Sequence, residues 1–325
     1  MKTRRAQPSK RNKGMRVGVS IFAIALGLGL VPNSAGGADT QLPRGDQTTV
    51  VIVTSSVVDA FEDAIAGLRR GLGSGVKVVL VDLAAKPEGL AAQLGNRDVR
   101  LLVTVGNNAL DAATKYATAP IIATMVLRKD LDAYRSGTPA GAVLLDLPLT
   151  DVLSQLAAVF PGKTRAGMIR NPAATGISGA TLVAQAKAAG MSLIVADCSR
   201  PEDLLRSFLS MRDRVDYVWA PPDGTLYTSA TVRPLIMASL ENRLPAVGFS
   251  ASFVRTGAVA GVYPDYVEVG LQAGEMARKY LTGAGGLSNE GPRKTRLAVN
   301  PRVGRLLGLR PFQKGEPTDG ITVIQ

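Results

Sequence analysis

The chain contains no histidine and a single cysteine, Cys198. Serine–histidine triads, cysteine–histidine pairs and histidine-based zinc or iron sites therefore cannot be assembled from it. One cysteine also excludes an internal disulfide framework, and Cys198 stands too far along the chain to be an acylated membrane tether. Chemistry based on carboxylates alone stays open, but no closely spaced pair of acids follows a predicted strand. These absences favour a binding protein over an enzyme, with no metal and no cofactor.

Signals for nucleotides and nucleic acids are equally sparse. Aromatic residues make up 5% of the sequence, and there is no Walker-type phosphate loop. Gly71, Gly73 and Gly75 form a GxGxG string, but it follows a predicted helix and precedes a predicted strand, which reverses the nucleotide-binding order. The net charge is +12, and the first 16 residues contribute seven of the positive charges. No nucleic-acid partner is expected.

The amino end has the pattern of an export signal. Its basic stretch carries no acid and leads into an apolar run over residues 17–31, which is shorter than the about 20 residues that span a bilayer. Small residues at Gly36 and Ala38 predict cleavage after Ala38, so residues 1–38 are expected to be a signal peptide. An uncleaved anchor is the alternative, and Met15 is an alternative start. The mature protein is expected in the periplasm as a monomer.

After this segment, short apolar runs alternate with amphipathic stretches, beginning with a strand over residues 49–54 and a helix over 59–72. This rhythm is typical of parallel sheets covered by helices. It reaches about Asp146 and then restarts, which predicts an α/β fold with two doubly wound lobes. In the second half we expect helices over residues 174–189 and 225–242, a strand over 257–262 and a loop over 283–296.

Small polar residues follow the predicted strands. In open parallel sheets, ligands bind at the carboxyl ends of strands, where loops feed helix amino termini. The candidate ligand-binding residues are Ser55, Ser56, Gly106, Asn107, Asn108, Thr124, Asn171, Thr175, Asp223, Gly224, Thr225 and Ser250. The same residue types are preferred helix caps and would stand there without a ligand. As binding residues, Asn107 and Asn108 suit an anionic ligand group, and Asp223 suits an amine.

The second half also carries longer motifs. They are Phe160-Pro-Gly-Lys, Ile169-Arg-Asn-Pro, Asp223-Gly-Thr-Leu-Tyr-Thr-Ser-Ala, Ala246-Val-Gly-Phe-Ser, Arg255-Thr-Gly-Ala-Val-Ala-Gly-Val-Tyr-Pro-Asp-Tyr, Gly270-Leu-Gln-Ala-Gly-Glu-Met-Ala, and Asn300 with Leu306-Leu-Gly-Leu. With them the chain resembles the ABC-transporter substrate-binding family, which has the type I periplasmic binding fold. The resemblance is specific in the second half and looser in the first, where Ser55, Ser56 and Val57 replace the family's His-Pro pair and Ala140-Gly-Ala replaces its Asn-Thr-Gly.

The resemblance implies two lobes joined by crossovers near Asp146, Ala251 and Leu287. Lobe 1 then comprises residues 48–146 and 253–286, and lobe 2 comprises 147–252 and 287–325. The lobes are expected to close on a hinge over a small polar organic solute, such as an amino-acid-like molecule. Asn171 and Asp223 match the family's ligand loops in lobe 2.

Two binding functions and one enzymatic function are compatible with this sequence. The first is a solute receptor that delivers its ligand to an ABC permease and its ATPase. The second is a periplasmic sensing subunit that contacts a membrane signalling protein. The third, an enzyme that uses acids in the cleft, would require turnover of a candidate ligand.

Overall fold

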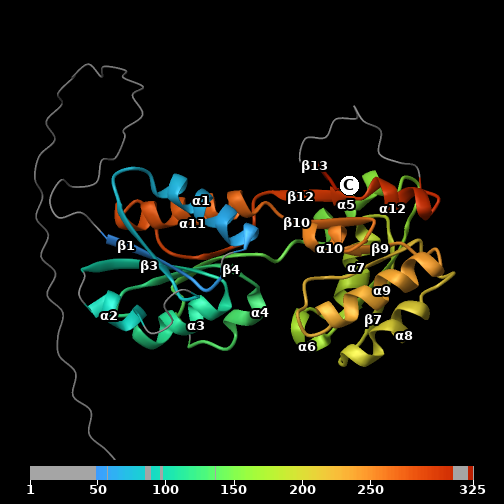
Figure 1. Ribbon diagram of the computed structural model, residues 1–325, viewed down its shortest axis with the longest axis horizontal. Coiled ribbons are helices and arrows are strands. Elements are labelled where there is room, and N and C mark those ends of the chain that lie inside the picture. Colours follow the sequence, from blue (N-terminus) through green and yellow to red (C-terminus); the bar gives the residue numbers. More distant parts are fainter. Residues whose placement is uncertain are drawn as a thin grey trace, which may run out of the picture. The chain divides into compact units, whose positions relative to one another are not determined.

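The computed structural model describes residues 49–56, 58–84, 89–95, 98–135, 137–309 and 321–324. The predicted signal peptide, residues 1–38, and the alternative start Met15 lie outside the described residues. Among the helices of the described part, none is long and apolar enough to cross a membrane. The described chain forms two sheets with helices packed on their faces (Figure 1). This confirms the predicted α/β fold with two sheets.

The first sheet is parallel and has the order β11-β5-β4-β3-β1-β2. Its strands are β1 (Thr49–Thr54), β2 (Lys77–Asp82), β3 (Val99–Val105), β4 (Ile121–Val126), β5 (Gly141–Leu144) and β11 (Asn289–Glu290). All six residues of β1 are buried, because the strand has partners on both edges and helices on both faces. The edge strand β2 exposes part of its length. Near-continuous apolar runs are typical of such doubly covered strands.

Two pairs of helices enclose this sheet. Helices α1 (Asp59–Leu72) and α11 (Tyr266–Leu281) cover one face, and α2 (Gly89–Gly95) and α3 (Asn107–Tyr116) cover the other. A short helix, α4 (Arg128–Leu131), follows β4. Figure 1 shows α1 and α11 side by side, although almost 200 residues separate them in the sequence.

The second sheet has the order β13-β12-β10-β9-β8-β6-β7. Its strands are β6 (Arg165–Arg170), β7 (Ser192–Asp197), β8 (Tyr217–Trp219), β9 (Ala246–Gly248), β10 (Ala260–Pro264), β12 (Thr295–Val299) and β13 (Ile321–Val323). Pairing is parallel except between β10 and β12, which is antiparallel. The first five strands in each sheet follow the doubly wound order 2-1-3-4-5, which leaves a ligand crevice at the strand ends where the order reverses.

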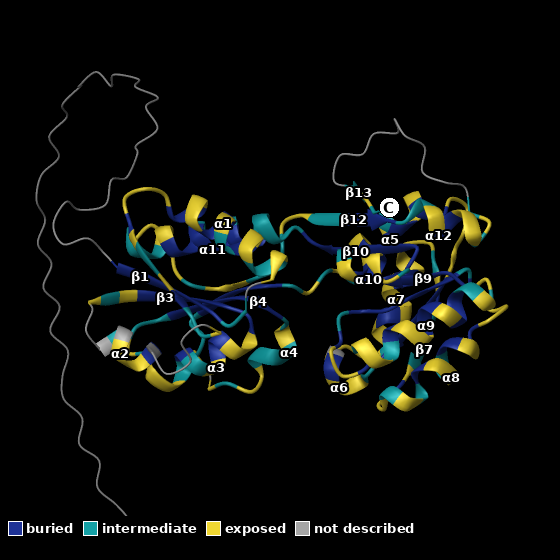
Figure 2. Ribbon diagram, in the orientation of Figure 1, coloured by how far each residue is buried: buried dark blue, intermediate teal, exposed yellow. Residues whose placement is uncertain are grey.

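Helices also cover both faces of the second sheet. On one face lie α5 (Leu149–Val159), α7 (Gly179–Ala188) and α12 (Pro301–Leu306), and on the other lie α8 (Leu204–Leu209), α9 (Ser229–Glu241) and α10 (Ala251–Arg255). The short α6 (Pro172–Thr175) follows β6 and a 3₁₀ turn, Pro201–Asp203, precedes α8. Figure 2 shows the central strands buried and the outer sides of the helices exposed, the pattern expected of a sheet between helix layers.

The strand pairing differs from the predicted lobe boundaries at two stretches. Residues 253–264, assigned to lobe 1, form most of α10 and all of β10, which pairs in the second sheet. Residues 289–290, assigned to lobe 2, form β11, which pairs in the first sheet. The chain therefore leaves the second sheet after Pro264, not near Ala251, and returns to it before Thr295, not near Leu287. An apolar run indicates a buried strand but not the sheet that the strand joins.

Two predicted helices are also wrong in their extent. The helix expected over residues 174–189 is divided into α6 and α7, because Gly176 adopts a left-handed φ of 62° and Ser178 starts a new helix as its cap. The helix expected from Thr225 begins at Ser229, after a turn over residues 224–227. In both places a local side-chain hydrogen bond competes with the helix.

The contact between α1 and α11 is made by glycines on both helices. A Cβ at Gly67 or Gly71 would fall on the backbone of α11, at the carbonyl oxygens of Val267 and Leu271. Conversely, a Cβ at Gly270 would fall on the carbonyl oxygen of Ala64. The two backbones therefore touch directly, and no side chain separates them.

We predict that Gly270→Ala lowers the free energy of unfolding by about 3 kcal/mol or more, at the upper end of overpacking costs, because the rigid backbone of Ala64 cannot move aside. Urea unfolding followed by circular dichroism measures this change. Gly286→Ala is the control, since a Cβ there meets nothing within 4 Å. Equal stability of the two variants would contradict the direct backbone contact.

Candidate functional site

The predicted site residues of the first lobe lie at the carboxyl edge of its sheet. Ser55 and Ser56 follow β1, where the Thr54 hydroxyl donates to the Ser56 carbonyl oxygen at 3.1 Å. Gly106 links β3 to α3 with a φ of 87°, and a Cβ there would stand 2.5 Å from the Phe61 ring. Only glycine adopts this φ at no steric cost. The position of Gly106 is thus explained by backbone shape.

Asn107 and Asn108 are the exposed first residues of α3. The Asn107 side chain lies near enough to the Asp130 carboxylate to favour its charged form. Burial alone would raise the pKa of Asp130, but hydrogen bonds from Lys129 and the Leu127 amide, together with Asn107, hold that pKa below its usual value. Asn107 is therefore already engaged in a local charged cluster after β4.

Thr124 lies within β4 and is fully buried. Its hydroxyl has no hydrogen-bond partner within the described part of the chain. The next residue, Met125, has a left-handed φ of 59°, and the register between β4 and β5 shifts there. A bulge of this kind redirects the strand end, so that Leu127 and Arg128 leave the sheet toward the crossover before α5.

The predicted residues of the second lobe form one connected network. The Asn171 amide nitrogen donates to the Thr225 hydroxyl at 3.1 Å, and that hydroxyl donates to Asp223 Oδ1 at 2.6 Å. Asn171 Oδ1 accepts from the Ala173 amide, while Asp223 Oδ1 also accepts from the Thr225 amide at 2.8 Å. The prediction that these residues follow strands of the second lobe is confirmed, and the structure shows that the two strands, β6 and β8, are neighbours. Asp223 caps a turn, however, and not the helix predicted to begin at Thr225.

Asp223 is 1% exposed, and its second oxygen, Oδ2, has no hydrogen-bond partner among the described residues. A buried carboxylate oxygen without a partner is costly, so a donor from outside the described chain would be favourable there. A Cβ at the next residue, Gly224, would have no atom within 4 Å.

Two predicted residues belong to helix ends. Ser250 caps α10, accepting from the Phe253 amide at 3.1 Å. Thr175 is the last residue of α6, and its side chain is outside what the structure describes.

A cavity of about 250 Å³ lies near the network, on the face of the second sheet that carries α5 and α7. It is lined by Leu127, Asp146, Leu147, Pro148, Leu149, Thr150, Met168, Ala174, Ile177, Leu182, Gln185, Trp219, Pro221, Pro222, Val262 and Pro264. None of the twelve predicted residues is among them. The cavity nevertheless adjoins the network, because Ala174 follows Asn171 in the same turn and Pro222 precedes Asp223.

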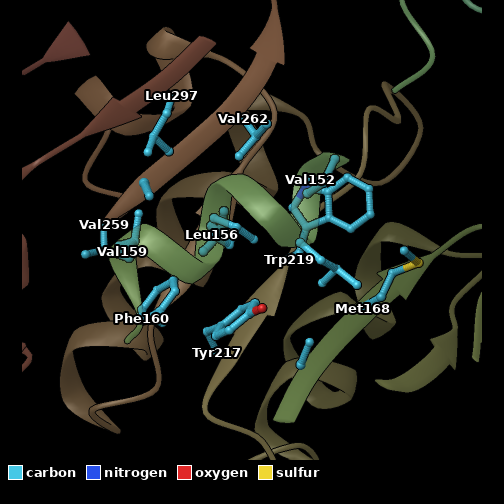
Figure 3. Packing of buried hydrophobic residues seen from close by; sticks show 14 of the residues in the cluster. Val152, Leu156, Val159, Phe160, Met168, Tyr217, Trp219, Val259, Val262 and Leu297 are labelled. Carbon is cyan, nitrogen blue, oxygen red and sulfur yellow. The ribbon is translucent and has the colours of Figure 1, made fainter. Parts of the chain in front are cut away.

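The cavity wall continues the hydrophobic core of the second lobe. Figure 3 shows Met168 and Trp219 at one edge of this core, away from Val159 and Phe160. Trp219 is 6% exposed, and its Nε1 has no hydrogen-bond partner among the described residues. The sequence patterns did not predict this apolar wall, because the candidate site residues were small and polar. The positions of Met168 and Trp219 near the ends of predicted strands could have indicated it.

The charged residue at the rim is Asp146, in the segment between β5 and α5. Its Oδ2 accepts a hydrogen bond from the Arg128 amide at 2.6 Å. Desolvation by the surrounding protein raises the pKa of Asp146, although part of the residue is exposed to solvent. In the described chain, no three histidine, cysteine, aspartate or glutamate side chains gather closely enough to hold a metal ion.

Comparisons with known proteins agree with the fold described above. The family model described as ABC transporter substrate binding protein matches residues 56–302. No curated protein matches the sequence. A ligand-free, open substrate-binding protein with adhesive properties from Clostridium difficile is similar in structure, with a TM-score of 0.65 at 16% identity over 86% of this chain and 99% of the other.

Two further solved structures share the fold. An ABC domain in complex with L-Trp from Streptococcus pneumonia has a TM-score of 0.57 at 15% identity, covering 86% of this chain and 100% of the other. A conserved domain protein from Vibrio cholerae has a TM-score of 0.55 at 19% identity, covering 82% and 96%. The family match extends over well more than half of the chain, and this protein belongs to the family of ABC transporter substrate-binding proteins.

Proposed function

We propose that this protein captures a small organic solute outside the cytoplasm and delivers it to an ABC permease. The observation that carries the proposal is the cavity of about 250 Å³ beside the strand ends of the second lobe, at the edge where open parallel sheets bind ligands. Its volume lies just below the range of about 300 to 1,000 Å³ that is common for drug-sized ligands. A small metabolite is therefore the appropriate ligand size.

The polar network beside the cavity supports a binding role for its charged member. Asp223 Oδ1 is saturated by the turn, whereas buried Oδ2 lacks a partner among the described residues. We propose that a ligand donor, such as an amine or hydroxyl, pairs with Oδ2, while Asn171 and Thr225 hold the carboxylate in place. The predicted residues of the first lobe, and Thr175, Gly224 and Ser250 of the second, stay candidates for ligand contact.

We further propose that residues 1–38 direct export and are cleaved, that the mature protein is a periplasmic monomer, and that it carries out no catalysis. The chain passes between the two sheets along three short segments, near residues 145–148, 265 and 291–294. A few short segments can act as a hinge.

The function is tested by a thermal-shift screen of small metabolites against the mature protein. A solute present at a hundred times its dissociation constant adds about 2.7 kcal/mol to stability, which raises the melting temperature by a few degrees. We expect at least one organic solute to do so with saturable binding in calorimetry. Absence of any stabilising solute, together with turnover of one of them, would favour the enzymatic alternative.

Hinge closure predicts that the solute found in this screen reduces the radius of gyration. Small-angle X-ray scattering at saturating solute, compared with the solute-free protein, measures the change. The protein with a non-binding metabolite is the control. An unchanged radius at saturation would argue for a rigid pair of lobes.

The role of Asp223 predicts a separation of stability from binding in Asp223→Asn. The amide oxygen keeps the acceptor for the Thr225 amide, so stability should fall by only about 1 kcal/mol. Loss of the unpaired charge should weaken binding of the screened solute by about 2 to 5 kcal/mol in calorimetry.

Asn300→Ala is the matched control. Asn300 caps α12 by accepting from the Val303 amide at 3.0 Å, and it does not line the cavity. Its loss should cost about 0.5 to 2 kcal/mol of stability and leave affinity unchanged. If Asp223→Asn also keeps affinity within about threefold, which is less than 1 kcal/mol, Asp223 is a structural cap alone.

A further inference from the structure

The cavity in the second lobe has an uneven charge distribution. Among the residues that the structure describes, no lysine or arginine side chain lines it, and Asp146 is the one formally charged lining residue. The other polar side chains of the wall belong to Thr150 and Gln185. A carboxylate or phosphate that entered this cavity would lose water and gain no basic partner there.

The Asp146 carboxylate forms no ion pair with a residue of the described chain. Its Oδ2 takes one hydrogen bond, from the Arg128 amide, and no lysine or arginine side chain of the described chain lies within ion-pair distance of it. The neighbouring acid differs in this respect, since Asp130 pairs with Lys129 at 2.8 Å. The Arg128 side chain contributes to the electrostatics at Asp146 only from a greater distance. Asp146 can therefore accept a cation at the cavity rim.

The wall offers a second feature that suits a cation. Trp219 is the single tryptophan of the chain and lines the cavity. An indole ring attracts organic cations more strongly than the other aromatic side chains, within about 6 Å of its centre. Met168 and Leu182 beside it provide apolar surface for the body of the same molecule.

Resting on the function proposed above, we infer that this cavity selects organic cations. A protonated amine lies between Asp146 and the ring of Trp219, and the apolar body of the molecule extends along Met168 and Leu182. The ligand group next to Asp146 carries no carboxylate. The expected class of ligand therefore changes from a polar, amino-acid-like molecule to one with a positive end and an apolar body, both of which occupy this cavity.

The experiment compares benzylamine, benzyl alcohol and benzoate, which share a ring and differ in charge. Binding to the mature protein at neutral pH is followed by the fluorescence of Trp219 and by calorimetry. Attraction of an ammonium and repulsion of a carboxylate by a rim charge each change affinity by up to about fivefold. Benzylamine should therefore bind about tenfold or more tightly than benzoate, with benzyl alcohol between them.

Asp146→Asn should bring the three affinities to within about threefold of one another while leaving benzyl alcohol binding unchanged. Asp132→Asn is the charge-matched control, because Asp132 is exposed and does not line the cavity. It should keep the full preference for benzylamine. Melting temperatures of both variants establish that they remain folded.

Equal binding of the three probes, tighter binding of benzoate, no binding of any probe, or an unchanged preference in Asp146→Asn would each overturn this inference. The proposed function is tested apart from it. A metabolite from the thermal-shift screen that binds without competing with benzylamine would leave solute capture standing and would overturn the cation site.

Discussion

The direct backbone contact between α1 and α11 is the constraint on which the first lobe depends. Helix α11 follows a strand of the second sheet, yet it covers the first sheet beside a helix from the start of the described chain. Glycines at 67 and 71 on α1 and at 270 and 274 on α11 allow the two backbones to touch. Arg278 then donates to the carbonyl oxygen of Gly71 at 3.3 Å. Because α11 is fixed there, the chain must pass between the sheets three times, and the lobes are joined by segments and not by a common core.

At the carboxyl edge of the second sheet, polar and apolar side chains have different structural roles. Polar side chains at the strand ends hold the loops: Asn171, Asp223 and Thr225 satisfy one another and the local backbone. The space beside them is enclosed by apolar side chains from the interior of the strands, such as Met168 and Trp219. Small polar residues give precise hydrogen-bond geometry, whereas apolar walls supply burial. This division fixes the shape of the strand-end loops and leaves the second oxygen of Asp223 without a hydrogen-bond partner among the described residues.

Family membership and the cavity are two independent observations that are both consistent with the binding of a small molecule. The family is defined by solute binding, and the similar solved structures include an open form and an L-Trp complex. At identities below 20% these structures inform the fold and not the ligand. The chemistry of the ligand must therefore be inferred from this chain's own residues, and of those that the structure describes, Asp146 and no basic side chain line the cavity.

The sequence by itself determined the fold class, most of the strands and the family, because alternating apolar and amphipathic runs and motifs such as Ile169-Arg-Asn-Pro are local properties. It also predicted that Asn171 and Asp223 follow strands of the second lobe. Only the tertiary structure decided which sheet receives β10 and β11, since burial of an apolar run does not name its partner. It likewise decided that Asp223 caps a turn and that Trp219 lines a cavity. Those outcomes depend on contacts between residues far apart in the chain, and no single segment of the sequence determines the energy of such contacts.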